Sequence, residues 1–351
     1  MSKKLKVGVI GLGGIANTHM PGWIDSDYTE VVAGCDVVES TMSTWRDKYG
    51  IDRVTNRAAD LIDDPSIDIL DLCVPNNYHA PLAIAAMKAG KHVLCEKPLA
   101  PNPALIRDMI AARDASGKML MAAQHFRFTS SAKTMKAEID SGVLGDIYHA
   151  RSWMLRRAAA PTRPGFILKD QATGGATIDI GVHILDLTLW FMGNPKPVSV
   201  TGVARTELAH KPGTFSIWGG NIPKEMDVEE FATAFVRFEN GSTLILEVSW
   251  LLHHKTDGED MQMWLYGTEG GIHWPQNAVY HTDLVAQKHV DRLLTDNLEL
   301  KEAHAQECIE FAEAILQGKP SPVPAEHSLQ VLTILDAVYT SQQTGREVLL
   351  A

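Results

Sequence analysis

The sequence is poor in the features that mark proteins binding polyanions and proteins stabilised by disulfides. Its 351 residues carry 43 acidic and 32 basic side chains, for a net charge of −11, and no segment is rich in lysine or arginine. This balance makes nucleic acid an unexpected partner. Cysteine is scarce, and the four residues lie far apart at Cys35, Cys73, Cys95 and Cys308. The spacing favours buried free thiols in a reducing compartment over a disulfide framework or a metal cluster.

Long apolar runs are also missing. No run approaches the length of about 18 residues that a membrane span needs, and the N-terminal segment MSKKLKVGVIGLGG enters a strand without a cleavable signal pattern. We therefore expect a cytoplasmic protein without membrane contact. Apolar residues make up 45% and charged residues 21% of the chain, as in globular proteins that fold without a partner. The length suits two domains.

Short apolar runs alternate with helical segments up to about residue 124. The apolar runs are 6–10, 31–35, 67–74, 91–95 and 118–124, and the helical segments are 14–25, 39–49, 79–90 and 102–116. Strands alternating with helices predict a parallel sheet that is covered by helices on both faces. We therefore predict an α/β fold with a doubly wound, dinucleotide-binding Rossmann domain over residues 1–124.

Longer strands follow in residues 125–351. They are expected at 147–157, 198–206, 231–238, 242–252 and 261–267, with helices at 177–192, 302–317 and 326–344. Asn240-Gly241 lies between two of these strands and is a strong hairpin signal. We predict an α+β domain with a large, mostly antiparallel open sheet, which binds substrate and forms oligomers; the C-terminal helix packing back on the first domain is an open alternative. The Gly- and Pro-rich loops 157–175 and 207–227 are candidate lids or subunit contacts.

A dinucleotide-binding turn is the first chemical motif. Gly11-Leu12-Gly13-Gly14-Ile15-Ala16 follows a strand, opens a helix and matches G-x-G-x-x-G/A. Gly11 permits the tight turn, and Gly13 lets the backbone approach a pyrophosphate held by the helix N-terminus. Asp36 ends the second strand, where an acid is needed to accept hydrogen bonds from the ribose hydroxyls. No cation adjoins Asp36 to meet a 2′-phosphate, so we predict that NAD is preferred to NADP.

Glu96-Lys97-Pro98 ends a buried strand, where a charge is costly unless something meets it. Ligands of open α/β sheets bind beyond the carboxyl ends of the strands. We therefore predict that Lys97 meets cofactor and substrate, although a solvated lysine in a turn is the common alternative. Three further residues follow the strand 67–74 and are predicted with Glu96 to line the cofactor site: Pro75, Asn76 and His79.

A second group of polar residues lies in the segment 174–183. Asp179 and His183 are four residues apart, so on one helix they share a face. This pair has three interpretations: a metal half-site, a pair that stabilises the helix, or a dyad that faces substrate. No third or fourth ligand is evident, so no metal is predicted.

With these segments the chain resembles the Gfo/Idh/MocA (glucose-fructose oxidoreductase, inositol dehydrogenase) family. The likeness covers nearly the whole chain and is carried by VGVIGLGGIA at 7–16, AGKHVLCEKP at 89–98, HFRF at 125–128, the helix at 174–190 and YGTEGGI at 266–272. The resemblance implies tightly held NAD(H) or NADP(H), a cis Lys97–Pro98 bond, and a catalytic trio of Lys97, Asp179 and His183. It also implies a homodimer or homotetramer packed through the open sheet. Ala176 and Phe166 depart from the common pattern of Gly and Trp, which leaves the details of the substrate pocket open.

The expected reaction is oxidation of a secondary alcohol of a sugar, glycoside or cyclitol. A cationic Lys97 would stabilise the developing alkoxide, and His183 would act as general acid and base, although the proton acceptor can be either of the two. Asp179 would bind a neighbouring hydroxyl. Arg127, Arg156 and Phe166 are weaker candidates for substrate contacts, because a salt bridge, a solvated edge or a core position explains such residues equally well.

Two rival functions are open at this point. One is an NAD-dependent, glycoside-cleaving enzyme that oxidises C3 transiently, eliminates the aglycone and leaves no net redox change. The other is a dinucleotide-binding sensor without catalysis, which would not need Lys97, Asp179 and His183 together.

Overall fold

The computed structural model describes residues 4–350, which divide into two compact units. The first contains the residues up to Phe128 together with Leu300–Leu329, and the second contains Thr129–Glu299 and the residues from Gln330 onward. The segment Leu300–Leu329 thus folds with the N-terminal residues although it lies far along the chain. Among the described residues, no helix has the length and apolar character needed to cross a bilayer.

The first unit is built on a six-stranded parallel sheet with the order β3-β2-β1-β4-β5-β6. This order reverses between β1 and β4, which is the place where doubly wound sheets bind dinucleotides. The prediction of a Rossmann sheet is confirmed. The strands are β1 (Leu5–Ile10), β2 (Thr29–Cys35), β3 (Val54–Thr55), β4 (Ile69–Leu72), β5 (His92–Cys95) and β6 (Leu120–Ala122).

Helices connect these strands and cover the sheet. They are α1 (Gly14–Asp25), α2 (Glu39–Tyr49), α3 (Ala58–Ile62), η1 (Asn76–Tyr78), α4 (His79–Lys88), α5 (Pro103–Ser116), η2 (His125–Phe128) and α11 (Ala303–Gln317). Helix α11 packs closely against α1, since a Cβ atom at Gly22 would lie 2.2 Å from the carbonyl oxygen of Ala305. Only glycine permits this approach. The contact holds the late helix against the dinucleotide-binding helix.

The second unit is built on a nine-stranded sheet with the order β16-β15-β14-β13-β7-β12-β11-β8-β17. Strands β7 and β12 run parallel and the other neighbours run antiparallel, so the prediction of a large, mostly antiparallel sheet is confirmed. The strands are β7 (Ile147–Arg156), β8 (Pro197–Arg205), β11 (Phe231–Phe238), β12 (Thr243–Ser249), β13 (Glu259–Gly267), β14 (Gly271–Trp274), β15 (Ala278–Asp283), β16 (Lys288–Leu293) and β17 (Val348–Leu349).

The hairpin predicted at Asn240-Gly241 joins β11 to β12. Gly241 has a φ of +85°, the left-handed conformation that glycine adopts without strain. Both predicted loops contain short elements that the sequence pattern did not reveal. These are α7 (Pro164–Ile167) and α8 (Lys169–Ala172) in the first loop, and β9 (Phe215–Ser216) and β10 (Gly220–Asn221) in the second. Helix α6 (Ser130–Asp140) was not predicted either.

The helix predicted at 177–192 is divided into α9 (Ala176–Asp179) and α10 (Gly181–Phe191), so its continuity was predicted wrongly. Helix α9 is anchored separately, because the buried Glu229 carboxylate accepts hydrogen bonds from the amides of Gly175 and Thr177. Ile180, with a φ of −109°, connects the two helices.

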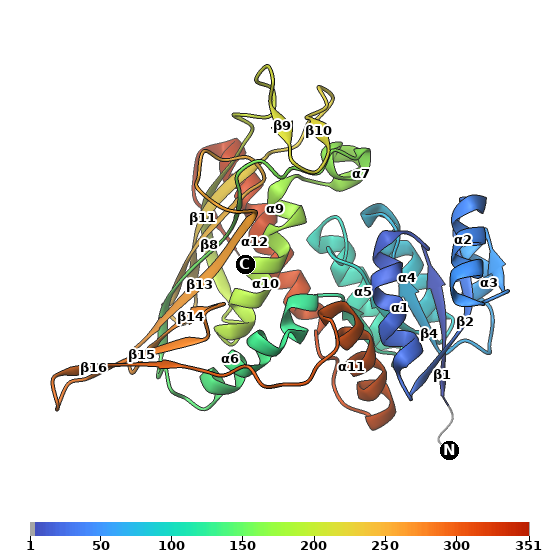
Figure 1. The fold of residues 1–351 in the computed structure, drawn as a ribbon, viewed down its shortest axis with the longest axis horizontal. Helices are drawn as coiled ribbons and strands as arrows, with labels where there is room; N and C mark the ends of the chain where they lie inside the picture. The colour runs from blue at the N-terminus through green and yellow to red at the C-terminus, as the bar shows by residue number, and fades with distance from the viewer. Residues whose placement is uncertain (1–3, 351) are drawn as a thin grey trace. The chain divides into compact units, whose positions relative to one another are not determined.

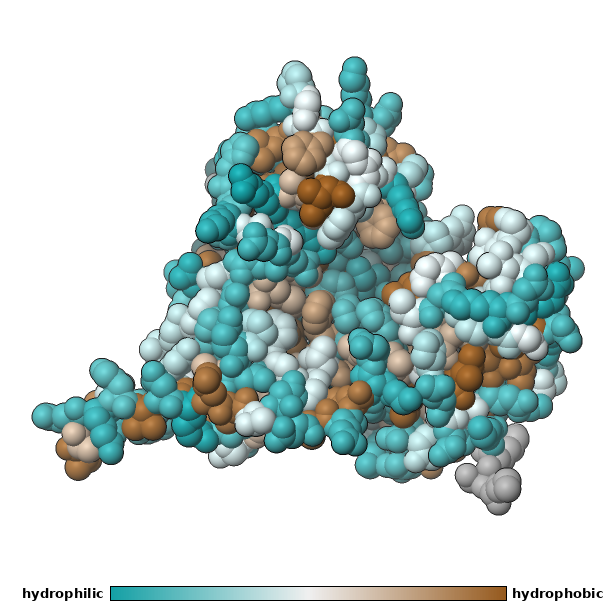
Figure 2. All heavy atoms as spheres, in the orientation of Figure 1, coloured by the Kyte–Doolittle hydropathy of each residue, from teal (hydrophilic) through white to brown (hydrophobic). Residues whose placement is uncertain are grey.

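The nine-stranded sheet is covered on one face. Helices α9, α10 and α12 (Ala325–Thr344) lie along this face (Figure 1), and the Gly202 amide in β8 donates a hydrogen bond to Ser341 Oγ in α12. The other side chains of the central strands are half-buried or exposed, and the alternation is clear in β11 and β12. Hydrophobic side chains also reach the surface along the β15–β16 hairpin, the thin arm in Figure 2.

Candidate active site

The turn after β1 has the backbone geometry that a pyrophosphate requires. Gly11 has a φ of +86°, and a Cβ atom there would lie 2.3 Å from the carbonyl oxygen of Cys73. A Cβ atom at Gly13 or Gly14 would meet nothing within 4 Å, so a ligand has room to approach the backbone. Helix α1 starts here without a side-chain cap, which leaves its N-terminal amides suited to phosphate oxygens. Ile15 lies in the first turn of α1.

Asp36 lies where β2 ends, next to this turn. Its Oδ2 accepts a hydrogen bond of 2.8 Å from the Leu12 amide, and its Oδ1 accepts one of 2.9 Å from the Val38 amide. A carboxylate has about four acceptor positions, so the fixed side chain can still accept ribose hydroxyls. The turn and Asp36 together fit the pyrophosphate and the adenosine ribose of NAD, whose nicotinamide supplies hydride chemistry when bound.

Two loops leave the sheet beyond β4 and β5. Pro75 caps the short helix η1, which begins at Asn76. His79 is fully buried, and its Nδ1 and Nε2 each lie 2.8 Å from a carbonyl oxygen, of Pro98 and Val74 respectively. Burial lowers the pKa of His79. Through these two contacts His79 connects the loop after β4 with the loop after β5. A direct contact of His79 with the cofactor stays a prediction.

Lys97 follows β5 directly and is partly exposed at the carboxyl edge of the parallel sheet. Its amide donates a hydrogen bond of 3.0 Å to Glu96 Oε2, and the Lys97–Pro98 peptide bond is cis, as expected. Glu96 itself is 7% exposed, so its carboxylate is directed into the protein and away from solvent. The negative charge of Glu96 after strand β5 is therefore met by groups inside the first unit.

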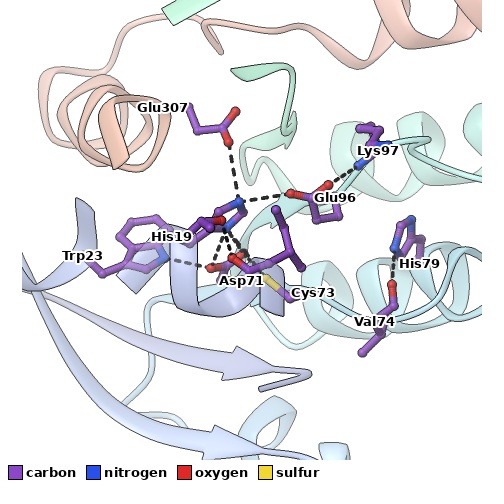
Figure 3. A network of polar contacts seen from close by, with 11 residues as sticks. His19, Trp23, Asp71, Cys73, Val74, His79, Glu96, Lys97 and Glu307 are labelled. Atoms are coloured by element: carbon purple, nitrogen blue, oxygen red, sulfur yellow. Dashed lines mark hydrogen bonds and ion pairs between the residues drawn. The ribbon is translucent and has the colours of Figure 1, made fainter. Parts of the chain in front are cut away.

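A buried polar cluster surrounds the Glu96 carboxylate (Figure 3). His19 on α1 places Nε2 3.0 Å from Glu96 Oε1 and Nδ1 3.0 Å from Asp71 Oδ2 in β4. The indole N–H of Trp23 donates a 2.8 Å hydrogen bond to the same Asp71 oxygen. Burial alone would lower the pKa of His19, but Asp71 and the neighbouring thiols raise it well above its usual range. Burial works against ionised Glu96 as well, yet His19 and Lys97 lower the pKa of Glu96 to about 2.

Helix α11 closes the cluster from another side. Glu307 is fully buried with Oε1 3.5 Å from His19 Nε2, and burial raises the pKa of Glu307 well above its usual range. The ring of His304 stacks on that of His125 with centroids 3.9 Å apart. Burial lowers the pKa of both rings, to about 3 for His125. The cluster therefore favours a protonated His19, an ionised Glu96 and a neutral Glu307.

The predicted dyad lies in the second unit. Asp179 ends α9, and its Oδ2 accepts a 3.2 Å hydrogen bond from the indole N–H of Trp250. The guanidinium of Arg156 lies 3.8 Å from the same oxygen. His183 lies in the first turn of α10 and is 7% exposed. Asp179 is therefore oriented by a tryptophan and an arginine of the same unit and remains partly exposed.

The weaker candidates occupy different environments. Arg156 is buried, pairs with Glu259 through Nε and lies with its guanidinium 4.6 Å from the Trp218 ring centroid. Phe166 on α7 is 39% exposed. Arg127 belongs to the first unit, is buried, and has Nη1 3.1 Å from His327 Nδ1. Arg156 approaches Asp179 within the second unit.

The sequence reasoning did not find His19, Asp71 and Glu307. Asp71 carried the one usable signal, because an acid within the apolar run ILDLCV must be paired if the strand is buried. His19 and Glu307 lie on helices at positions that resemble ordinary polar ones. Their burial depends on the packing of α1 against α11, two helices that are distant in sequence.

A Rossmann sheet with this turn and a charged edge, together with a separate open-sheet unit, defines an NAD-binding oxidoreductase. Residues 5–124 match the family described as oxidoreductases with an NAD-binding Rossmann fold, and residues 132–273 match the GFO/IDH/MocA C-terminal domain. These two matches cover more than half of the chain. The chain belongs to the GFO/IDH/MocA family.

Two of the curated relatives match along nearly their full length. The chain is 28% identical to D-glucoside 3-dehydrogenase of Escherichia coli over 351 residues, which cover 99% of this chain and 98% of the relative. It is 27% identical to myo-inositol 2-dehydrogenase of Thermotoga maritima, with 99% and 98% coverage. Levoglucosan dehydrogenase, solved with NADH and levoglucosan, has the same fold, with a TM-score of 0.84, 24% identity and 99% coverage of both chains.

Proposed function

We propose that this protein is an NAD-dependent dehydrogenase that transfers hydride between nicotinamide and a secondary alcohol of a sugar, glycoside or cyclitol. The observation that carries the proposal is Lys97, a partly exposed lysine fixed at the carboxyl edge of the sheet whose β1 turn suits a dinucleotide. Relatives named for glucoside and inositol dehydrogenation support the substrate class.

The proposed mechanism divides the work between the two units. Lys97 stabilises the oxygen of the substrate hydroxyl as it becomes an alkoxide, and His183 accepts the hydroxyl proton while hydride leaves the same carbon. Asp179 accepts a hydrogen bond from a neighbouring hydroxyl and thereby orients the ring. The mechanism requires both units to present these side chains to one substrate carbon.

The side chains around Asp179 favour a polyhydroxylated substrate over an anionic one. Arg156 is paired with Glu259 and lies beside Asp179, so its charge is largely compensated and does not call for an anionic ligand. Trp218 and Phe166 are exposed aromatics of the same unit and are suited to the apolar face of a sugar ring. We therefore propose Arg156 and Phe166 as substrate contacts and leave Arg127 as a weaker candidate.

The test is a substrate panel with NAD and, separately, NADP. NADH absorbance is followed with myo-inositol, levoglucosan, methyl glucosides and free hexoses, and Lys97→Ala serves as the control. We expect net NADH formation with at least one of them. Release of p-nitrophenol from a nitrophenyl glucoside, with NAD required and no net NADH, would instead establish the glycoside-cleaving alternative. Dinucleotide binding without either reaction would support a sensor.

We also propose a cytoplasmic homodimer or homotetramer that associates through the second unit. The uncovered face of the sheet carries half-buried aromatic rings that stack on one another, among them Trp153, Trp264 and His273. The β15–β16 hairpin exposes Leu284 by 82% and Val285 by 97%. Sedimentation should give a dimer or tetramer, and Trp264→Glu should shift the protein toward monomer.

A further inference from the structure

A continuous polar chain leads from helix α1 to Lys97 (Figure 3). Trp23 donates to Asp71, Asp71 contacts His19 Nδ1, His19 Nε2 contacts Glu96, and Glu96 accepts the amide hydrogen of Lys97. The three heavy-atom distances from Asp71 to the Lys97 amide are each 3.0 Å. The chain crosses β4 and β5, so it connects three elements of the first unit.

The burial of this chain makes it costly unless it is complete. His19 and Asp71 have no solvent exposure and Glu96 has little. A buried charge that loses its partner costs several kcal/mol, so each link depends on the next. An ordinary surface turn would not need such a chain to hold one lysine.

We propose that His19 is a positioning residue for Lys97, acting through the Glu96 carboxylate. His19 fixes one carboxylate oxygen and leaves the other to accept the Lys97 amide, so the loop after β5 has one favoured conformation. The proposal deepens the dehydrogenase assignment and rests on it for its kinetic arm.

Helix α1 carries both His19 and the turn that suits the dinucleotide phosphates. Helix α1 begins at Gly14, in the turn that suits the dinucleotide phosphates, and His19 lies five residues further along the same helix. One rigid helix thereby fixes both the phosphate end of the cofactor site and the lysine loop. A displacement of α1 would move both together.

Protons, and not a metal ion, account for the cluster in this proposal. His19, Glu96 and Glu307 lie close enough to hold an ion, as do His19, Asp71 and Cys73. Both His19 nitrogens lie 3.0 Å from a carboxylate oxygen, Nδ1 from Asp71 and Nε2 from Glu96, so an imidazolium is paired without an ion, although the Nε2 contact is an ion pair and not an aligned hydrogen bond. The titratable groups that face His19 and Glu96 are Asp71, Cys73, His79, Cys95, Lys97, His125, His304, Glu307 and Cys308.

The first experiment reads Lys97 without any substrate. Trace acetylation with acetic anhydride at a fixed mildly alkaline pH, followed by mass spectrometry, measures the reactivity of the Lys97 amine. In Glu96→Gln the ion pair with His19 is lost and the loop after β5 no longer has one favoured conformation, so we expect the acetylation of Lys97 to rise roughly three- to tenfold. In His19→Gln we expect a similar rise, because Glu96 loses the cation that keeps it ionised and in place.

The second experiment is a double-mutant cycle in kcat with the best substrate of the panel. Each single variant should lose roughly ten- to a hundredfold, and the His19→Gln/Glu96→Gln double variant should be no worse than either, because all three break one chain. Glu230→Gln is the matched control. Glu230 is also a buried carboxylate that accepts backbone amides, from Glu207 and Leu208, but it belongs to the second unit. It should change neither Lys97 acetylation nor kcat.

Three results would overturn the proposal. These are unchanged Lys97 acetylation in both single variants, multiplicative losses in the double variant, and a stoichiometric metal ion in the purified protein that His19→Gln removes. Unaltered NAD binding shows that each variant is folded. If no sugar is oxidised while acetylation still responds, the dehydrogenase assignment fails and the link between His19 and Lys97 stands. If sugars are oxidised but acetylation does not respond, the opposite holds.

Discussion

Two buried tryptophans, one in each unit, donate their indole N–H to an aspartate. Trp23 in the first unit bonds Asp71, and Trp250 in the second bonds Asp179, and neither indole is exposed to solvent. Their acceptors differ. Asp71 is fully buried and shared with His19, whereas Asp179 is partly exposed beside Arg156.

The difference between the two aspartates lies in their burial and in the role that burial allows. In the first unit the Asp71 carboxylate is bonded by Trp23 and His19 and is closed to solvent, so it holds other side chains in place and binds no ligand. In the second unit the tryptophan orients a carboxylate that still faces solvent, and a ligand hydroxyl can take the place of water. Burial of the acid therefore distinguishes a supporting residue from a binding residue, although both bond a tryptophan.

The largest expected effects come from the residues that would touch substrate. Lys97→Ala and His183→Ala should each reduce kcat by at least about a hundredfold, or about 3 kcal/mol in transition-state free energy, because each removes a charge or a proton acceptor from the reacting oxygen. NAD binding, followed by fluorescence quenching, should be largely retained. A near-normal rate in either variant would remove that residue from the mechanism.

The buried cluster should also give the first unit a characteristic acid sensitivity. The pKa of Glu96 is lowered from 4.5 to about 2, so its contribution is complete above its unfolded value and is lost as the pH falls toward 2. The shift corresponds to up to about 3 kcal/mol. Urea unfolding at neutral pH should show Glu96→Gln less stable than the unmodified protein, and the gap should narrow between about pH 4.5 and pH 2.

The sign is opposite for His19. Its pKa is raised, so its contribution is present at neutral pH and is lost as the pH rises through the raised value. His19→Gln should therefore be destabilised most just below about pH 6.5, and the gap should narrow as the pH rises. A stability gap for Glu96→Gln that stays constant across the acid range would show that folding does not lower the pKa of this carboxylate.

The tryptophan pair can be compared directly. Trp23→Phe and Trp250→Phe remove the same indole volume, so the difference between them isolates the bond to the aspartate. We expect Trp23→Phe to lower the free energy of unfolding by about 2 to 4 kcal/mol, and Trp250→Phe by roughly 1 kcal/mol less, because water can reach Asp179. Trp250→Phe should in addition lower kcat/KM severalfold. Equal losses of stability and unchanged kinetics would show that the two aspartates are not used differently.

The sequence was sufficient for the Rossmann sheet and the open sheet, since period and turn chemistry are local properties. It also placed Lys97, Gly11 and Asp36 at strand ends, because parallel strands share one carboxyl edge. The break between α9 and α10 was missed because it depends on Glu229, a residue 50 positions away from Asp179 in the chain. The His19 cluster was missed for the same reason, since it forms where α11 packs against α1, two helices that are distant in sequence.

The smallest effect we predict concerns the choice of cofactor by the first unit. Asp36→Ala removes the acceptor at the end of β2 and should weaken NAD binding about tenfold while leaving NADP binding nearly unchanged, because the 2′-phosphate no longer meets a negative charge. Asp68→Ala is the control, since Asp68 likewise accepts a backbone amide, from Lys6, but lies at the amino end of β4. Fluorescence titration with both dinucleotides measures the ratio of affinities. A ratio that changes equally in both variants would show that Asp36 only supports the fold, as Asp71 does, and would leave the ribose without its predicted partner.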